Sequence, residues 1–238
     1  MKDLRRLSGD EIANYKCRKC KFDMVHGTGF EENKVMALGV REECEVVDKF
    51  CYLGDMLSAG GGADAAVVTR IGCAWKKFRE LKPILTCKYV SDKTKGKVYT
   101  ACVRSVMKYA SETWPMKKTT GVLLERNEMR MVRWMCGVTL MDRVNSDILR
   151  ERLGIRPIGE EIRTARLRWF GHVMRKDDED WVKQCMELDV EGKSMQGNRK
   201  TWMRTVSEDM KQKGLKVEEC ADRKAWRRGI NLVGQGNR

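Results

Sequence analysis

Residues 64–81, DAAVVTRIGCAWKKFREL, carry the pattern that decides the fold. Apolar side chains recur there at the three- and four-residue spacing of one helix face. They are Val67, Ile71, Ala74, Phe78 and Leu81. Asp64 is suited to cap the start of this helix, and Pro83 is expected to end it. The stretch therefore predicts an amphipathic helix with one buried face.

The same helical pattern continues from this stretch to the end of the chain. The predicted helices and their apolar stripes are a helix from Ser91 to Trp114 with Val98, Cys102, Val106 and Tyr109; one over about 121–136 with Leu124, Met131, Val132 and Met135; a short one from Asn145 or Ser146 to Gly154; one over about 160–176 with Ile162, Ala165, Trp169 and Val173; and two over 199–213 and 222–232.

The chain before residue 63 has a different pattern. Residues 46–57, VVDKFCYLGDML, are aromatic and β-branched and run into SAGGG, which favours a strand or hairpin followed by a sharp turn. Residues 1–45 show no such pattern. We therefore predict a mainly α protein, a helical bundle with a small N-terminal β element and an irregular, cysteine-containing N-terminus. The expected division is 1–45, 46–62, 63–140 and 141–238.

The composition indicates a basic protein with enough apolar residues for a core. The 238 residues include 48 Lys and Arg against 34 Asp and Glu, a net charge of +14, and 42% are hydrophobic. No run approaches the roughly 18 apolar residues of a membrane span, so we expect no membrane partner. The first residues, MKDLRRLSGDE, are polar, and we expect a nuclear or cytoplasmic protein that is not secreted. The charge suggests a polyanionic partner, most commonly nucleic acid.

The 10 cysteines are scattered along the chain, which does not suggest a disulfide framework. Only Cys17 and Cys20 have the close spacing of zinc ligands. A tetrahedral zinc site needs four ligands, and His26 and Cys44 would complete a set only with irregular spacing. We therefore expect no metal and no cofactor, and keep zinc at Cys17 and Cys20 as the alternative.

Three groups of basic side chains are candidates for contact with phosphate. Arginine binds phosphate oxygens through paired hydrogen bonds and stays charged at any relevant pH. Residues spaced by i, i+4 and i+7 share one face of a helix. The candidates are Lys93, Lys95 and Lys97 in the first turns of the helix that opens at Ser91; Arg126, Arg130 and Arg133 at helical spacing; and Arg168, His172 and Arg175 at the same spacing.

Each candidate group also has a structural interpretation. The arginines of 121–136 would then form a solvated face paired with Glu125, Glu128 and Glu161. His172, which follows Gly171, is either a phosphate or base contact or, as we prefer, a buried histidine bonded to a neighbouring helix. The tryptophans recur about once per helix and are assigned mostly to the core. Stacking on single-stranded bases would need exposed rings beside the basic faces.

Six short stretches occur in an order that carries a resemblance. They are 50–54 (FCYLG), 59–62 (AGGG) with 70–78 (RIGCAWKKF), 97–114 (KVYTACVRSVMKYASETW), 131–137 (MVRWMCG), 166–175 (RLRWFGHVMR), and 199–202 (RKTW) with 222–227 (DRKAWR). Together they resemble the C-terminal part of the reverse transcriptase of non-LTR (LINE-type) retrotransposons, the part that follows the polymerase palm. The resemblance covers about 46–230.

This resemblance implies a thumb, a helical bundle that grips the template–primer duplex through its backbone. It also implies that Tyr52, Leu53 and Gly54 form the strand at the palm–thumb junction. Some family members carry a cysteine-rich finger before that strand, and residues 15–20, with Cys17 and Cys20, resemble its last ligand pair. The family's Gly-Arg-Pro before R-K-T-W reads Gln-Gly-Asn at 196–198, so we assign no role to that loop.

The catalytic motif of the resembled family is missing. Nucleotidyl transfer in that family needs carboxylates that hold two metal ions, supplied by an aromatic residue, any residue and then Asp-Asp. The only Asp pair, Asp177-Asp178, follows Arg175-Lys176 and is interpreted as a solvated turn. We therefore expect no catalytic residue and no enzyme activity. The prediction is a fragment truncated before its palm that retains binding to RNA or DNA, such as an RNA–DNA hybrid or template–primer duplex. The alternative is an inert or repurposed helical protein-interaction module.

Overall fold

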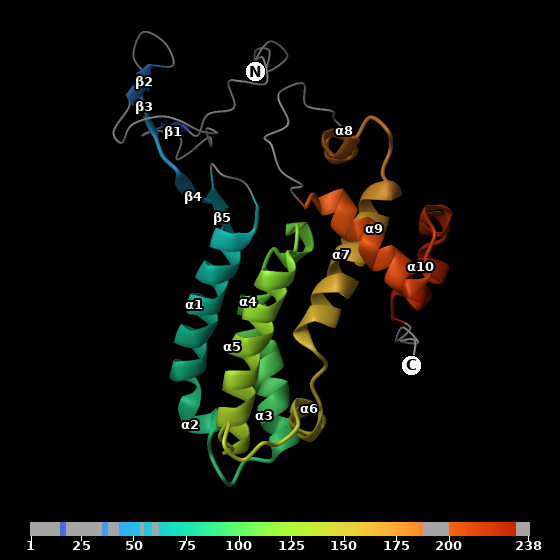
Figure 1. The fold of residues 1–238 in the computed structure, drawn as a ribbon. Coiled ribbons are helices and arrows are strands. Elements are labelled where there is room, and N and C mark those ends of the chain that lie inside the picture. Colours follow the sequence, from blue (N-terminus) through green and yellow to red (C-terminus); the bar gives the residue numbers. More distant parts are fainter. Residues whose placement is uncertain are drawn as a thin grey trace. The chain divides into compact units, whose positions relative to one another are not determined.

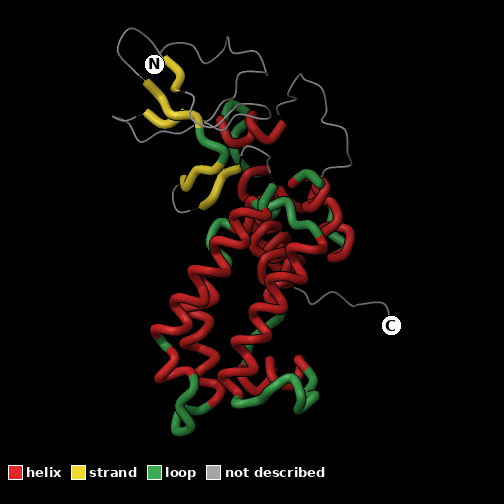
Figure 2. The backbone as a smooth tube through the Cα atoms, turned by 60° about the vertical axis from the view of Figure 1, so that its left-hand side comes forward, coloured by secondary structure: helices red, strands yellow, loops and turns green. Residues whose placement is uncertain are grey.

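The computed structural model describes residues 15–17, 35–37, 43–52, 55–58, 62–187 and 200–231. The chain forms two compact units, Met1–Ala66 with Glu187–Arg199, and Val67–Met186 with Lys200–Arg238. The described strands belong to the first unit, and nearly all helical residues belong to the second (Figures 1 and 2). The fold is mainly α with a small N-terminal β element, as the sequence predicts.

The helices follow one another with short connections. They are α1 (Asp64–Glu80), α2 (Lys82–Leu85), α3 (Asp92–Val98), the π-helical η2 (Tyr99–Arg104), α4 (Ser105–Met107), the 3-10 helix η3 (Ser111–Thr113), α5 (Lys118–Cys136), α6 (Ser146–Leu153), α7 (Ile158–Met174), α8 (Trp181–Glu187), α9 (Trp202–Lys213), the 3-10 helix η4 (Val217–Ala221) and α10 (Arg223–Asn231). Among these described helices, none combines the length and the apolar character that a membrane crossing requires.

Two small antiparallel sheets precede α1. One contains β1 (Tyr15–Cys17), β3 (Glu43–Val46) and β2 (Val35–Ala37) in that order, and the other is a hairpin of β4 (Lys49–Tyr52) and β5 (Asp55–Ser58). The hairpin confirms the prediction for 46–57. The three-stranded sheet adds short strands to the stretch 1–45, for which the sequence predicts no regular element. Its strands have three or four residues each, which is too short for an alternating pattern to show in the sequence.

Helix α1 forms over the predicted stretch. Asp64 lies in its first turn rather than in the cap position before it, and Leu81, the last member of the predicted stripe, follows the helix and is half-buried. Val67, Ala74 and Phe78 are fully buried, and Ile71 is nearly so. Helix α1 ends at Glu80, before the proline, which lies in the first turn of α2, where a missing backbone amide costs no hydrogen bond. The stripe from Val67 to Phe78 is therefore the core face of α1.

The helical stretch after Ser91 packs in a register different from the predicted one. Its buried apolar side chains are Tyr99, Val103 and Met107. The predicted stripe was Val98, Cys102, Val106 and Tyr109, whose members are half-buried or exposed. The buried face also carries Lys95 and Arg104, so polar residues interrupt the apolar pattern on the side that packs. The apolar periodicity therefore predicts a face that lies beside the one that is actually buried.

Helices α5 and α6 match their predictions closely. The predicted inward side chains of α5 are all buried, namely Leu124, Met131, Val132 and Met135. Asn145 caps α6, because its Oδ1 accepts a hydrogen bond from the backbone N–H of Asp147 at 2.8 Å. Gly154 ends α6 with a φ of +66°, a backbone conformation that glycine adopts without strain.

Helix α7 has neighbours at both of its ends. It packs against α5, α9 and α10 (Figure 1), and also against η3. Its buried apolar side chains are Ile158, Ile162, Leu167, Phe170 and Val173. Ala165 and Trp169, which were predicted to be core residues, are only half-buried, because a helix covered on two sides does not follow a single stripe.

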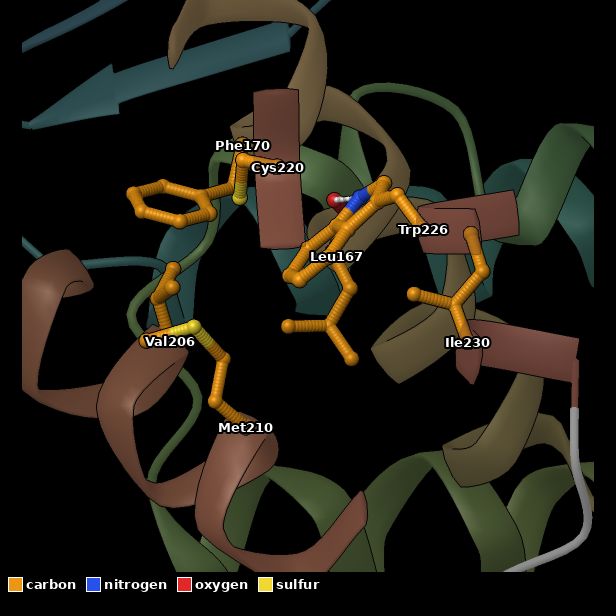
Figure 3. Close-up of a cluster of buried hydrophobic side chains, with 7 residues drawn as sticks. All are labelled: Leu167, Phe170, Val206, Met210, Cys220, Trp226 and Ile230. Carbon is orange, nitrogen blue, oxygen red and sulfur yellow. Dashed lines mark hydrogen bonds between the residues drawn. The ribbon is translucent and has the colours of Figure 1, made fainter. Parts of the chain in front are cut away.

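The C-terminal helices pack on α7 through a compact apolar cluster (Figure 3). Its members are Leu167, Phe170, Val206, Met210, Cys220, Trp226 and Ile230. The indole Nε1 of Trp226 donates a hydrogen bond to the carbonyl oxygen of Leu167 at 2.9 Å. Burial raises the pKa of the Cys220 thiol to about 11. The cluster therefore fixes α10 against the last turns of α7.

Two buried arginines hold helices together inside the second unit. Arg104 is fully buried, and its Nη2 lies 2.8 Å from Glu128 Oε1 while its Nη1 lies 2.9 Å from Glu161 Oε1. Burial raises the pKa of Glu128, although the guanidinium of Arg104 acts in the opposite direction. Arg166 on α7 pairs with Asp209 on α9. Both arginines are structural rather than available to a ligand.

Candidate nucleic-acid interface

A pocket of about 800 Å³ is formed by side chains of α7 and α10, and we call it the α7–α10 pocket. Its cationic lining consists of Arg168, His172, Arg175, Arg223 and Arg227, and its apolar lining includes Trp169, Trp226 and Ile230. Glu112 is the acidic residue of the lining. The predicted group at 168–175 is thus brought together with two arginines from the end of the chain.

Helical geometry explains why these side chains converge. Arg168 and His172 lie four residues apart on α7, and Arg223 and Arg227 lie four residues apart on α10, so each pair shares one helix face. The neighbouring side of α10 carries Trp226, which is buried in the apolar cluster. Burial of this indole fixes the rotation of α10 and directs its arginine pair toward the pocket.

The positive charge of the α7–α10 pocket is largely uncompensated. Within the described part of the chain, no carboxylate lies within ion-pair distance of Arg168, Arg223 or Arg227. Arg175 is more constrained, because its Nη1 donates to the carbonyl oxygen of Cys220 at 2.9 Å. Uncompensated guanidinium groups that converge on one pocket favour an anionic ligand with several phosphate groups.

His172 is exposed, so the preferred interpretation of a buried histidine is wrong. Its ring lies 5.5 Å from the ring of Trp169, measured between centroids. The neighbouring Gly171 is the buried residue, and a Cβ there would lie 2.6 Å from Cδ1 of Trp226. Adjacent residues of a helix point about 100° apart. The glycine therefore admits the Trp226 indole, while the histidine faces the pocket.

The predicted arginines of α5 contribute to a second pocket, which we call the α1–α5 pocket. It has a volume of about 600 Å³, and its lining includes Arg79, Arg130, Arg133, Trp75 and Trp134. Arg126 is exposed on the same helix but does not line this pocket. Two of the three predicted arginines are therefore brought together with Arg79 of α1, which was not among the predicted site residues.

The lysine group of α3 is only partly available. The prediction that Lys95 contacts phosphate is wrong, because its side chain is buried and its Nζ donates to the carbonyl oxygen of Met135 at 3.2 Å. Met135 lies in the last turn of α5, where a cation is favourable for the helix dipole. Lys93 and Lys97 are exposed and line neither pocket. Their contact with phosphate stays a prediction.

The alternative interpretation, in which Glu125, Glu128 and Glu161 pair with the arginines of α5, is wrong for two of these three carboxylates. Glu128 and Glu161 pair with the buried Arg104 instead. These acids face the interior of the bundle, so they are not partners for the exposed Arg126 and Arg130. The basic face of α5 is therefore not neutralised by them.

Arg223 and Arg227 are site residues that the sequence pattern does not predict. Their i, i+4 spacing within the predicted helix 222–232 was a usable signal, because it places both on one face. What the sequence did not reveal is that this face lies beside residues 168–175. That proximity follows from the burial of Trp226 against α7.

The predicted palm–thumb junction and zinc ligands lie largely outside the described residues. Tyr52 ends β4 and is partly exposed, whereas Leu53, Gly54 and Cys20 fall outside that part of the chain. The backbone of Cys17 is paired with that of Cys44 in the three-stranded sheet. Where residues are described, no group of three His, Cys, Asp or Glu side chains is placed to hold a metal ion.

Comparisons with known proteins give one informative similarity. No protein-family model and no solved structure matches the chain. The chain is 24% identical over 145 residues to a protein of Caenorhabditis elegans that is named as transposon-derived. The match covers 59% of this chain and 52% of that protein, so the chain spans about half the length of its relative. The similarity is consistent with an origin in a transposable element.

Proposed function

We propose that this chain binds RNA or DNA through the sugar–phosphate backbone, with the α7–α10 pocket as the principal contact. The observation that carries the proposal is the convergence of four arginines and His172 on one pocket. Guanidinium groups bind phosphate oxygens in pairs of hydrogen bonds, and phosphate contacts fix position without reading sequence. The expected ligand is therefore a backbone, such as that of an RNA–DNA hybrid or template–primer duplex.

The proposed origin of this activity is the post-palm part of a retrotransposon reverse transcriptase. It is supported by the ordered motifs from 50–54 to 222–227 and by the similarity to a transposon-derived protein of Caenorhabditis elegans. The printed sequence contains no aromatic–x–Asp–Asp motif, so we propose binding without catalysis. In a primer-extension assay with Mg²⁺, we expect no template-dependent synthesis by this chain. Synthesis would contradict this part of the proposal.

The binding proposal is tested by reversing the charges of the pocket. In the variant Arg168→Glu/Arg223→Glu/Arg227→Glu, we expect the affinity for a fluorescein-labelled RNA–DNA hybrid to fall by at least about 100-fold. Loss of only one or two charged hydrogen bonds, at about 1.5–3 kcal/mol each, is enough for a change of that size. The slope of log affinity against log salt should also decrease by roughly 1 for each phosphate contact that is lost. Fluorescence anisotropy across a salt series measures both quantities.

The matched control is Lys93→Glu/Lys97→Glu/Arg126→Glu. It changes the net charge by the same amount at exposed positions that line neither pocket. We expect a smaller loss of affinity in this variant. An equal loss in both triple variants would show that charge is spread evenly and would overturn the assignment of the pocket. Absence of any salt-dependent binding by the wild-type chain would favour the protein-interaction module.

A further inference from the structure

The α1–α5 pocket contains an exposed indole on a rigid base. The side chain of Trp134 is 43% exposed, and its ring lies 6.4 Å from that of Trp75 and 5.6 Å from that of Phe78, measured between centroids. Phe78 is fully buried in the stripe of α1, and Trp75 Nε1 donates to Asn127 Oδ1 at 3.0 Å. The exposed ring is therefore held in place before any ligand binds.

Cations surround this aromatic cluster. Lys82 Nζ lies 5.0 Å from the centroid of Trp134, and Arg130 Cζ lies 5.9 Å from the centroid of Trp75. Arg79 lines the same pocket, and the lining includes no carboxylate. In the described part of the chain, neither Arg79 nor Arg130 has an ion-pair partner. An anion near the rings would meet charges that are free to pair with it.

A loop of fixed conformation supplies the remaining wall. Val138, Thr139 and Leu140 line the pocket. Arg133 donates from Nη1 to the carbonyl oxygen of Thr139 at 3.4 Å and from Nη2 to that of Val144 at 3.2 Å. The Asp142 carboxylate accepts from Thr139 N at 2.6 Å, and this bond lowers its pKa. Arg133 is therefore a positioning residue, and Asp142 is occupied within the loop.

We infer that the α1–α5 pocket binds single-stranded nucleic acid, with an unpaired base stacked on Trp134 and the adjoining phosphates on Arg79 and Arg130. Base–aromatic stacking tolerates any sequence, because every base has a π face, and basic side chains track the backbone. A paired base has its faces covered by its neighbours in the stack, so the indole selects single strands. The volume of about 600 Å³ lies within the range of ligand pockets, roughly 300–1,000 Å³. This inference does not depend on the α7–α10 pocket.

The test uses oligo-dT and oligo-rU single strands labelled with fluorescein. We expect Trp134→Leu to weaken binding of both strands by roughly 5- to 150-fold, the range that stacking of one base contributes. An abasic strand of the same length keeps the phosphates and lacks the bases. Its affinity should be lower than that of oligo-dT for the wild type and unchanged by Trp134→Leu. Arg79→Glu should weaken binding of all three strands.

The matched control is Arg126→Glu, which reverses an exposed charge on α5 outside the pocket. It should affect binding less than Arg79→Glu does. Circular dichroism checks that Trp134→Leu is folded. If it is not, the test is the comparison of single-strand affinity between Arg79→Glu and Arg126→Glu, which change exposed side chains. The inference is overturned if Trp134→Leu binds oligo-dT like the wild type, or if Arg79→Glu and Arg126→Glu are equivalent.

The contributions of the two pockets to binding can be distinguished by testing each variant with the ligand of the other pocket. The variant Arg168→Glu/Arg223→Glu/Arg227→Glu should retain the sensitivity of oligo-dT binding to Trp134→Leu, since the stacking contact is made elsewhere. Trp134→Leu should leave binding of the RNA–DNA hybrid nearly unchanged. If Trp134→Leu weakened hybrid and single strand equally, the α1–α5 pocket would be a general backbone contact and the inference would be wrong.

Discussion

Replacement of Arg104 by methionine is expected to lower the free energy of unfolding by about 3–5 kcal/mol, because it leaves a buried carboxylate without its partner. The side chains of Arg104 and Glu128 are both fully buried, 2.8 Å apart between Nη2 and Oε1. The other carboxylate partner of Arg104, Glu161, also contacts Lys108 and would keep that cation, whereas the carbonyl oxygen of Arg156 would lose a donor. Urea denaturation followed by circular dichroism measures the loss.

The loss of unfolding free energy in Arg104→Met should increase as the pH rises. Burial already raises the pKa of Glu128, and removal of the arginine raises it further. Below the pKa of the unfolded carboxyl, Glu128 is neutral in both states, so the variant avoids the cost of a buried charge. As the pH rises through the raised pKa of the folded state, that cost appears in full. The deficit of Arg104→Met should therefore be smaller at pH 4.5 than at pH 8.

The companion variant separates the charge from the packing. Arg104→Met/Glu128→Met replaces the pair by apolar side chains and should recover much of the lost stability, since buried ion pairs are often replaceable by hydrophobic residues. Its stability should also lose the additional pH dependence. If the double variant is as unstable as the single one at every pH, the loss reflects packing rather than an unpaired carboxylate.

Replacement of Gly96 by alanine is expected to destabilise the protein by about 3 kcal/mol, although alanine is the better helix former by about 1 kcal/mol. Gly96 lies on α3 against the end of α6, and a Cβ there would lie 2.8 Å from the carbonyl carbon of Leu153 and closer still to its oxygen. The obstacle is backbone, which cannot rotate away. The two helices would have to separate.

A second glycine provides the control. Gly72 is exposed within α1, and a Cβ there would meet nothing within 4 Å. Gly72→Ala should therefore stabilise the protein by about 0.5–1 kcal/mol, in line with helix propensity. Thermal and urea denaturation of both variants measure the contrast. Stabilisation by Gly96→Ala would mean that α3 and α6 do not approach as closely as described.

The contrast between the stripes of α1 and α5 and that of α3–α4 shows what periodicity can and cannot predict. The predicted apolar stripes of α1 and α5 are buried, except for Leu81. On the stretch 92–107 the buried face includes a lysine and an arginine, whose burial depends on partners in α5 and α7. The local sequence pattern does not reveal such distant partners, so the predicted stripe is shifted by one residue from the face that is buried.

For the candidate site, the sequence predicts which residues share a helix face, but not which helix faces lie next to each other in the fold. The spacing of Arg168, His172 and Arg175 identified one face of α7, and the structure places all three around one pocket. Their counterparts Arg223 and Arg227 lie about fifty residues later in the sequence, which gives no local signal of contact. Likewise, the exposure of Trp134 depends on how α1 and α5 pack.

Helix α7 is one continuous helix that packs both against α5 and against the C-terminal helices α9 and α10. Its first turns help to enclose Arg104, and its last turns carry the apolar cluster that holds α10. If either set of neighbours detached, the same seventeen residues would lose part of their cover. We therefore expect opening of the bundle and release of the C-terminal helices to be coupled, and an anion that binds the arginines beside α10 should also slow amide exchange at the start of α7.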